Sequence, residues 1–514
     1  MRKLLPTAVY NPITFTGLAI SSISFGLIIF LFILEFFADD AHPYMGIIAF
    51  IILPGILIVG LLIVGAGIIR EKRRETLGIT RGGRFPVINL NDPKQMRMFT
   101  IFSTGTLLLL LFSAFGSFKA YEYTESDSFC GTICHAVMEP EYVAYLSSPH
   151  SRVGCVKCHI GSGATWFVKA KISGAYQVYS VLFNKYSRPI PTPVHELRPA
   201  EGTCEQCHSP EHFFSEVKFK SNYYLYDEEN TKSSISMLLK IGGSNEEFGR
   251  SEGIHWHMNV ANKIEYLHTD EKRNNIPWVK LTTKNGEEII YRNNEIEFDK
   301  NNYDKNNIRL MDCIDCHNRP SHIYYPADKS VNLALFLKRI DESLPYIKSV
   351  AVDALEQSYT KKIIGLDSIK ISIENFYSYN YPEVYKNKSE SIRKSIEEVQ
   401  KIYNRNYFPS MQVSWRGFPN HISHLYDTGC FRCHDGKHFS DDGKVIRKEC
   451  NLCHTIIAQV TADGEEQLSL NGLDFIHPVE LEKSIESQNC VKCHARDRDE
   501  DEQEKDQLVE RIAD

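Results

Sequence analysis

The 514-residue chain has no cysteine outside one short pattern that occurs seven times. This leaves no thiols for a separate disulfide framework. A thioredoxin-like redox pair is also excluded, because such a pair would occur only once. The chain also has little net charge, formally −7, so we expect no nucleic-acid partner. No short apolar stretch near the start ends in a small-residue cleavage site, so we expect no cleavable signal peptide.

The repeated pattern is Cys-x-x-Cys-His in six copies, and the first copy along the chain has one more residue between its cysteines. Two thiols can add across the vinyl groups of one haem, and the imidazole directly behind them can bind its iron. Structural zinc sites do not require a histidine behind every pair. The sequence therefore predicts seven covalently bound haem c groups, held by Cys130, Cys134 and His135; Cys155, Cys158 and His159; Cys204, Cys207 and His208; Cys313, Cys316 and His317; Cys430, Cys433 and His434; Cys450, Cys453 and His454; Cys490, Cys493 and His494.

Three apolar segments in the first 121 residues are each long enough, or nearly so, to cross a bilayer as a helix. They cover about 13–37, 46–69 and 99–118, and we expect residues 1–121 to form a membrane domain. The segments are less well explained as buried core helices of a soluble domain, because all three lie close together at one end of the chain.

Charge predicts how these segments are oriented. The loop between the second and third segments holds eight basic residues, Arg70, Lys72, Arg73, Arg74, Arg81, Arg84, Lys94 and Arg97. The first loop instead has Asp39, Asp40 and His42. The positive-inside rule then predicts a cytoplasmic N-terminus and a periplasmic domain after the third helix, in the inner membrane of a bacterium. This agrees with the haem motifs, because haem c is attached on the oxidising side of the membrane.

The expected fold is mainly α with little regular structure: three transmembrane helices, then a periplasmic multihaem domain with a small β-rich insertion. Haems one to three occupy 122–215, and the haem-free insertion covers 216–310. Within the insertion, two strand-like runs flank Asn285-Gly286, which predicts a hairpin. Haems four to seven occupy 311–494 with a helical spacer at 330–405, and 495–514 is a charged tail.

Eleven histidines of the exported part lie outside the motifs, which is enough to give most irons a second imidazole ligand. A bis-histidine iron is a low-potential electron carrier that is closed to substrate. His212, His322 and His438 follow a motif histidine by four or five residues, so they would remain on its own side of the haem. We therefore expect these three to bind a neighbouring iron.

Other histidines precede a motif or lie in the insertion. His150, His195, His424 and His477 are the candidates that precede a motif. In the Gly253–Met258 segment, an extended chain would point His255 and His257 to the same face. We expect one of them to be a ligand, with a slight preference for His257. His268 and His421 are expected to lie at the surface or beside ligands.

The first haem differs from the others. Met138 follows His135 by three positions, and the alternative to iron binding is simple packing. A methionine ligand would give this haem a different potential from its bis-histidine neighbours. Its position shortly after the third membrane segment would suit entry of electrons from a lipid-soluble donor.

Residues from about Phe99 to His322 resemble the NapC/NirT family of membrane-anchored quinol dehydrogenases. The resemblance rests on the uncleaved helix and on FCGTICHAVMEPEYVAYLSSPHSRVGCVKCH, with first haem, methionine, Ser-x-x-His and second haem in family order. It implies a quinol site beside the first haem and a methionine that can replace its motif histidine. It also implies a lysine after the second haem in the quinol pocket, either Lys169 or Lys171, and an acid that takes the quinol proton, Glu139 or Glu141.

The chain also departs from that family, whose typical members have one helix and four haems. The longer pattern, including CHNRPSH and GCFRCHDGKH, resembles the ImcH-like seven-haem inner-membrane cytochromes of metal-respiring bacteria. We therefore predict a protein that oxidises menaquinol and passes electrons to periplasmic c-type cytochromes or to a terminal reductase.

Two other functions were weighed against this one. An electron-relay or anchor subunit of a larger membrane complex would take electrons without binding quinone. A catalytic multihaem reductase would require an open iron, often with lysine in place of the motif histidine, and the chain has no Cys-x-x-Cys-Lys. The oligomeric state is not predicted.

Overall fold

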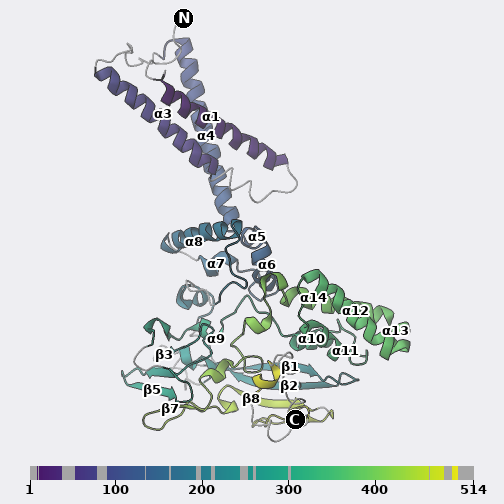
Figure 1. Ribbon diagram of the computed structural model, residues 1–514. Helices are drawn as coiled ribbons and strands as arrows, with labels where there is room; N and C mark the ends of the chain where they lie inside the picture. The colour runs from purple at the N-terminus through teal and green to yellow at the C-terminus, as the bar shows by residue number, and fades with distance from the viewer. Residues whose placement is uncertain are drawn as a thin grey trace, which may run out of the picture. The chain divides into compact units, whose positions relative to one another are not determined.

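The chain divides into two compact units, residues 1–133 and 134–514. The computed structural model (Figure 1) describes residues 9, 11–37, 52–77, 90–133, 135–160, 164–192, 198–209, 213, 215–242, 253–258, 262–298, 303–461, 463–479 and 489–495. The first unit holds the long helices α1 (Pro12–Phe37), α3 (Leu53–Thr76) and α4 (Pro93–Thr124), followed by the short α5 (Asp127–Thr132).

Helices α1 and α3 pack closely because small residues line their contact. A side chain on Gly17 would meet the carbonyl oxygen of Gly60 at 2.7 Å, and one on Gly67 would meet Thr14 Oγ1 at 2.5 Å. Asn11 adds a hydrogen bond from Nδ2 to the carbonyl oxygen of Gly67 at 3.3 Å. Small residues and buried polar contacts are typical of helix pairs in lipid.

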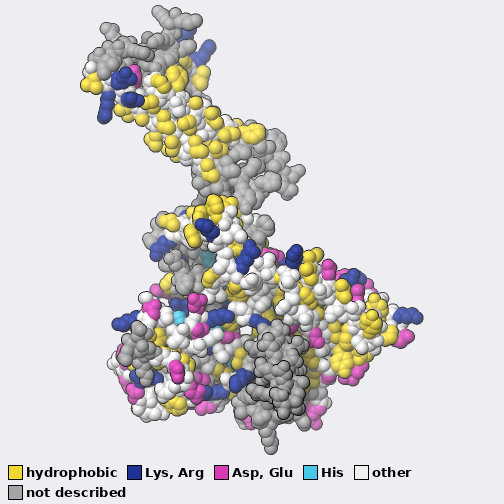
Figure 2. Space-filling view, in the orientation of Figure 1, with side chains coloured by type: hydrophobic (Ala, Val, Ile, Leu, Met, Phe, Trp, Pro, Cys, Tyr) yellow, Lys and Arg dark blue, Asp and Glu magenta, His cyan; other side chains and the backbone are white. Residues whose placement is uncertain are grey.

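Two helices among the described residues are long and apolar enough to cross a membrane, over Pro12–Phe30 and Leu53–Arg74. Only 22% and 17% of these windows are buried, which does not fit core helices of a soluble protein. Figure 2 shows apolar side chains along this unit. The predicted segment 99–118 lies within α4, which is 32 residues long but is not one of these two. The start of the predicted 46–69 segment lies outside the described residues.

The second unit begins with helices α6 (His135–Leu146), α7 (Cys155–His159) and α8 (Ala164–Leu182), followed by the 3-10 turns η3 (Ala200–Gly202) and η4 (Cys204–Gln206). Two antiparallel sheets follow. One has the order β1-β2-β8-β9, with bounds Glu216–Tyr224, Lys232–Lys240, His454–Val460 and Glu466–Leu468. The other has the order β6-β3-β4-β5-β7, with bounds Ile308–Leu310, Lys263–Leu267, Trp278–Thr282, Glu288–Asn293 and His438–Ser440.

The predicted hairpin is confirmed as β4 and β5, which pair from Trp278↔Arg292 to Thr282↔Glu288. Gly286 in its turn has φ +80°, a conformation that favours glycine. Each sheet also takes strands from the last third of the chain: β8 pairs with β2, and β7 pairs with β5. Residues of the predicted insertion are therefore joined to the region of the fifth and sixth cysteine motifs.

The helical spacer contains the largest hydrophobic cluster of the described residues. Its helices are α10 (Ala327–Phe336), α11 (Ile347–Glu356), α12 (Lys362–Asn380), α13 (Pro382–Asn387) and α14 (Ser389–Asn406). Helix α14 buries Ile392, Ile396, Val399 and Tyr403 on one face. Gly365 of α12 lies against the Tyr403 ring, where a larger residue would clash.

The other helices and 3-10 turns of the described residues are short. They are η7 (Ile254–Met258), η8 (Lys305–Asn307), α9 (Cys313–Cys316), η9 (Pro409–Met411), η10 (Trp415–Gly417), η11 (Gly429–Arg432), η12 (Cys450–Leu452) and α16 (Val491–His494). The first cysteine of six motifs lies on a short helix or 3-10 turn, namely α5, α7, η4, α9, η11 or η12, and α16 follows Cys490 directly.

Candidate haem-binding site

In several motifs the helical turn brings the first cysteine and the histidine together. The backbone N–H of the histidine donates to the backbone carbonyl oxygen of the first cysteine. This bond is 2.8 Å long from His208 to Cys204 and 3.0 Å long from His434 to Cys430. The same bond joins His317 to Cys313 and His494 to Cys490. One turn of helix therefore presents a thiol and an imidazole to the same side, as attachment to one haem requires.

Each of the six regular motif histidines faces one other histidine. A metal–imidazole bond is about 2 Å long and the ring centre lies about 1 Å further, so two imidazoles on one iron have ring centres roughly 6 Å apart. The observed ring-centre separations are 6.1 Å for His150–His208, 6.2 Å for His159–His322, 6.4 Å for His255–His317, 5.8 Å for His257–His434, 6.2 Å for His424–His454 and 6.3 Å for His477–His494. Their spacing fits six irons with two imidazoles each.

The hydrogen bonds of the histidines facing the motifs point to the same use. The Nδ1 atom of His150 lies 3.1 Å from the Pro320 carbonyl oxygen, that of His257 lies 2.8 Å from Ile254 O, and that of His477 lies 2.9 Å from Val479 O. A metal-bound histidine usually donates its other ring N–H to such an oxygen. This tautomer leaves Nε2 for the iron.

Burial also favours the neutral imidazole that binds metal. Burial lowers the pKa of His257 to about 4, with the neighbouring rings of His434 and His255 acting in the same direction. Burial likewise lowers the pKa of His424 and His454. These rings are therefore favoured in the neutral form, which is the form that binds iron.

Both histidines of the Gly253–Met258 segment face a motif, contrary to the expectation of only one. The segment is a 3-10 helix rather than an extended chain. His255 faces His317 of the fourth motif, whereas His257 faces His434 of the fifth. A single helical turn thus places one histidine against motif four and the other against motif five, so both remain candidate ligands.

His438, another predicted distal ligand, does not face a motif histidine in the described residues. Its side chain is fully buried, and both ring nitrogens already have partners. Nδ1 lies 2.9 Å from Asp435 Oδ1, and Nε2 lies 2.9 Å from the Ile276 carbonyl oxygen. His438 thus ties strand β7 to the neighbouring chain.

Two further histidines have other partners, as expected for residues that are not ligands. His421 is buried between Asp427, 2.7 Å from Nδ1, and the Lys272 carbonyl oxygen. His268 lies 2.9 Å from the Asp270 carbonyl oxygen. The candidates His195 and His212 lie outside the described residues.

The first motif is only partly described, because Cys134 and the His135 side chain lie outside the description. Met138 is half-buried on α6, which begins at His135. Positions three apart lie on one face of a helix. Met138 can therefore replace His135 beside an iron, but it cannot oppose His135 across one.

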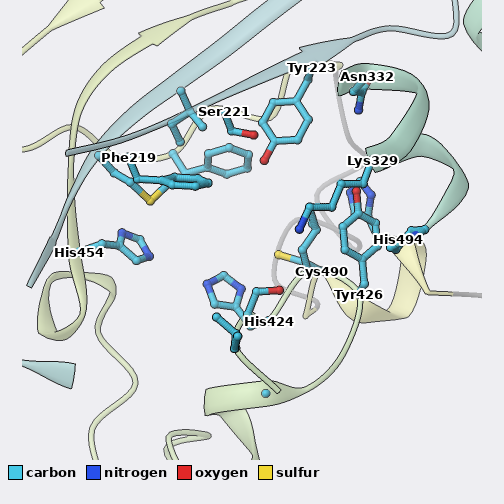
Figure 3. Close-up of a pocket in the computed structure, with 18 of the residues that line it drawn as sticks. Phe219, Ser221, Tyr223, Lys329, Asn332, His424, Tyr426, His454, Cys490 and His494 are labelled. Atoms are coloured by element: carbon cyan, nitrogen blue, oxygen red, sulfur yellow. The ribbon is translucent and has the colours of Figure 1, made fainter. Parts of the chain in front are cut away.

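A cavity of about 2650 Å³ holds four of the six histidine pairs. Pockets for small molecules usually measure roughly 300–1,000 Å³. Figure 3 shows His424 and His454 pointing into the cavity, with His494 and Cys490 at its other end. Lys329 also extends into it, and burial lowers the pKa of its ammonium group. The cavity fits several haems packed together.

The cysteines of successive motifs lie within electrostatic reach of one another. Burial is the largest cause that raises the pKa of the Cys158 thiol, and the charges of Cys204 and Cys207 raise it further. The same coupling joins Cys313 to Cys204, Cys316 to Cys430, Cys453 to Cys430 and Cys490 to Cys450. Such effects fall off with distance, so the cysteines in each of these pairs of motifs lie near one another.

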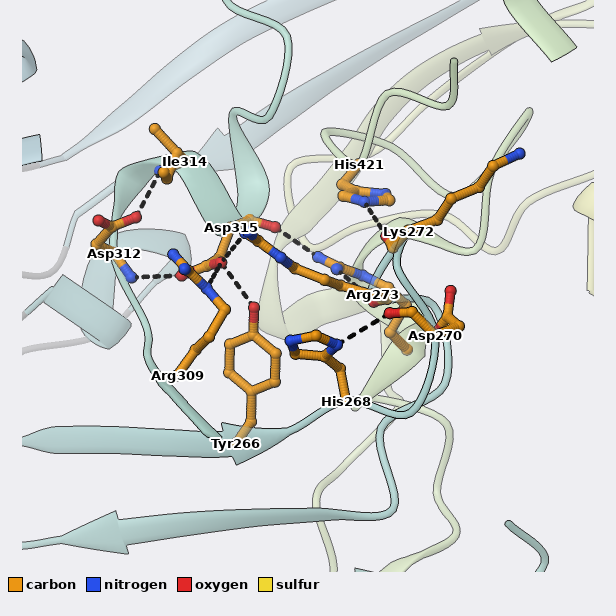
Figure 4. Close-up of polar contacts among 11 residues, drawn as sticks. Tyr266, His268, Asp270, Lys272, Arg273, Arg309, Asp312, Ile314, Asp315 and His421 are labelled. Atoms are coloured by element: carbon orange, nitrogen blue, oxygen red, sulfur yellow. Dashed lines mark hydrogen bonds and ion pairs between the residues drawn. The ribbon is translucent and has the colours of Figure 1, made fainter. Parts of the chain in front are cut away.

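A buried polar network joins motifs four and five (Figure 4). Asp315, between the cysteines of motif four, accepts hydrogen bonds from Tyr266 at 2.6 Å, Arg273 at 2.9 Å and Arg309 at 3.0 Å. Arg432, between the cysteines of motif five, donates to the Asp315 carbonyl oxygen at 2.7 Å. These bonds fix one motif against the next.

The acids and lysines expected at a quinol site lie on α6 and α8. Glu139 pairs with Lys362 Nζ at 2.6 Å. Glu141 pairs with Arg319 at 3.3 Å, and its Oε2 lies 3.1 Å from His322 Nδ1. Glu141 therefore helps to orient His322. Lys169 and Lys171 lie in the first half of α8.

Comparison with known proteins identifies the family. Residues 92–191 match the N-terminal region of the NapC/NirT cytochrome c family. The chain is 41% identical over 487 residues, covering 94% of its length, to the cytochrome c-type protein ImcH of Geobacter sulfurreducens, 95% of which is covered. No solved structure matches significantly. The chain therefore belongs to the ImcH family of multihaem electron-transfer cytochromes c, which carry a NapC/NirT-type N-terminal region.

Proposed function

We propose that the protein oxidises menaquinol at the bacterial inner membrane and passes the electrons to periplasmic cytochromes or reductases. The observation that carries the proposal is the set of six facing histidine pairs, one for each regular motif. When bound, haem c supplies one-electron redox chemistry. The chain contributes the ligands, their spacing and the exclusion of water.

The ligand pattern favours electron transfer over substrate reduction. Each of the six described motif histidines has a second imidazole opposite it, so neither face of these six sites is left for a substrate. His150, His255 and His322 come from segments outside the motif that they face, which makes the sites interdependent. We propose seven haems, with the first at Cys130, Cys134 and either His135 or Met138.

The surface of α8 supports a quinol site near the first haem. Ile172, Tyr176 and Tyr179 on α8 and Phe183 directly after it are all exposed, and their spacing places them on one helical face. Lys169 and Lys171 lie on the same helix. An exposed apolar face with lysines suits the membrane–water boundary, where quinol headgroups lie. We propose Lys169 or Lys171 as the quinol contact and Glu139 as the acid.

The test is reduction of the protein by a water-soluble reduced menaquinone analogue, followed at the haem Soret band. The full chain in lipid vesicles is expected to be reduced by the quinol, and the Lys169→Ala/Lys171→Ala variant is expected to be reduced at least tenfold more slowly. A control, Lys218→Ala, changes an exposed lysine on β1 and keeps both lysines of α8. If quinol leaves every haem oxidised while dithionite reduces them, the protein is a relay or anchor subunit that takes electrons from another complex.

A further inference from the structure

Arg432 lies between the two cysteines of motif five, and three backbone carbonyl oxygens hold its guanidinium group. Nε donates to Gly429 at 2.9 Å, Nη1 donates to Arg273 at 2.9 Å, and Nη2 donates to Asp315 at 2.7 Å. These carbonyls belong to η11, to the loop after β3 and to α9. The planar group is therefore fixed in one position by three separate parts of the chain.

No contacting carboxylate neutralises the positive charge of Arg432. An arginine side chain is charged at any ordinary pH. Among the described residues, all three hydrogen bonds of Arg432 end on carbonyl oxygens and none ends on an acid. The Asp315 carboxylate instead pairs with two other arginines, at 2.9 and 3.0 Å. Asp427 and Asp435, the acids that flank motif five, bond to buried histidines.

The guanidinium group lies beside the attachment points of two haems. Arg432 directly precedes Cys433, and Asp315, whose carbonyl oxygen it binds, directly precedes Cys316. Arg432 and both of these cysteines line the cavity of about 2650 Å³. The η7 turn faces the same two motifs with its two histidines, so the two sites are neighbours. Because each cysteine holds a porphyrin edge in the loaded protein, one charge lies next to two haems.

A fixed positive charge beside a haem favours the reduced state. Reduction adds one electron to the ferric iron and lowers the charge of the haem by one, and no bond forms or breaks. Arg432 therefore repels the oxidised state more strongly than the reduced state, and this repulsion is only weakly screened where water is displaced. The result is a higher redox potential at every haem that lies close to the guanidinium group.

We propose that Arg432 raises, with a single charge, the redox potentials of both haems held by motifs four and five. This inference rests on the proposed electron-transfer function and names a residue that sets two of its potentials. Because the same charge acts on both haems, it does not drive their potentials apart. Electron transfer between these two neighbouring sites is therefore not opposed by the charge that raises them.

The test is a redox titration of the full-length, haem-loaded protein with chemical mediators, followed by haem absorbance. Arg432→Gln removes the charge and is expected to lower the potential of two haems. At a fixed potential, the ratio of reduced to oxidised haem at these two sites should fall about tenfold, which corresponds to about 59 mV for one electron. Arg432→Lys keeps the charge but loses the planar fork, and it should leave the ratio within about threefold of the unmodified protein.

Histidine variants allow each of the two haems to be followed separately. In His255→Ala and His257→Ala, the haem that loses its second imidazole is expected to become high-spin and to absorb apart from the others. Adding Arg432→Gln should lower the midpoint potential of this high-spin signal in both backgrounds. His477→Ala marks the haem of motif seven in the same way, and there the addition should leave the midpoint unchanged.

Two further variants separate charge from structure. Arg393→Gln makes the same change at a side chain that is 55% exposed on α14, and it should leave all potentials unchanged. Asp315→Asn removes a negative charge from the same network and should raise the two potentials, so it decides the question if Arg432→Gln binds fewer haems.

The proposal is overturned by equal shifts in Arg432→Gln and Arg432→Lys, by unchanged potentials in Arg432→Gln, or by a lowered potential in Asp315→Asn. A haem count on each variant distinguishes the loss of a haem from a change in its potential. Because mediators replace quinol as the electron donor, the outcome does not depend on quinol oxidation.

Discussion

A histidine can bind iron only if one ring nitrogen has no other partner, and this condition separates His257 from His438. His257 keeps Nε2 available and faces His434, whereas both nitrogens of His438 are held by Asp435 and Ile276. Sequence spacing could not distinguish them, because each lies within reach of a motif along the chain. The contacts that distinguish them are those of His257 with His434 and of His438 with Ile276, and each joins residues more than 100 positions apart in sequence.

Replacing the two histidines should therefore give different results. His257→Ala is expected to convert one low-spin haem to a high-spin form, because one iron loses its second imidazole. His438→Ala is expected to leave the ligation unchanged and to cost about 1–3 kcal/mol of stability, because it removes two buried hydrogen bonds. Optical spectra at about 600–650 nm detect the high-spin haem, and thermal unfolding measures the loss of stability. A high-spin haem in His438→Ala would restore that residue as a ligand.

Met138 can be tested against a methionine that is purely structural. If Met138 binds the first iron, Met138→Leu is expected to change the spectrum of one haem and to slow reduction by quinol. Dithionite should still reduce the other haems. Met411→Leu, a buried methionine in an apolar cluster, is the control and should cost less than about 1.5 kcal/mol without spectral change. Identical spectra and quinol rates for Met138→Leu and the unmodified protein would remove the ligand role.

At the scale of elements, local sequence patterns predicted the parts of the fold that depend on neighbouring residues. The Asn285-Gly286 turn produced its hairpin, and the spacer predicted to be helical at 330–405 contains α14. The pairing of β2 with β8 joins residues over 200 positions apart, so no local pattern could reveal it. The 3-10 turn at Ile254–Met258 was also missed, since His-Trp-His alternation imitates a strand.

The helical spacer should carry much of the stability that does not depend on haem. Ile369 of α12 is fully buried in its cluster, so Ile369→Ala is expected to cost about 2–5 kcal/mol. Ile371 on the same helix is 55% exposed, and Ile371→Ala should change stability by less than about 0.5 kcal/mol. Far-UV circular dichroism during heating gives the melting temperatures of the two variants. Equal melting temperatures for the two variants would contradict the burial of Ile369.

At the scale of the whole molecule, the two units suit two environments. Helices α1 and α3 expose most of their apolar side chains, whereas the second unit places its histidine pairs among short turns and two sheets. Membership of the ImcH family supports a membrane-anchored cytochrome. The inner-membrane orientation rests on the basic loop between the second and third segments.

This orientation predicts the behaviour of fusion proteins. A reporter that is active only in the cytoplasm should work when fused after Arg84, in the basic loop. A reporter that is active only in the periplasm should work after His159, beyond α4. The reverse pattern would place the haem motifs on the side where haem c is not attached, and the charge argument would then be wrong.

The number of covalent haems tests the central claim most directly, because every proposed step depends on a full series of loaded motifs. Pyridine haemochrome absorbance of the purified full-length protein, divided by the polypeptide concentration, gives this number. The account predicts seven haems per chain. A value of six would show that the lengthened first motif is not loaded, and would contradict both the seven-haem series and the entry of electrons at its first member.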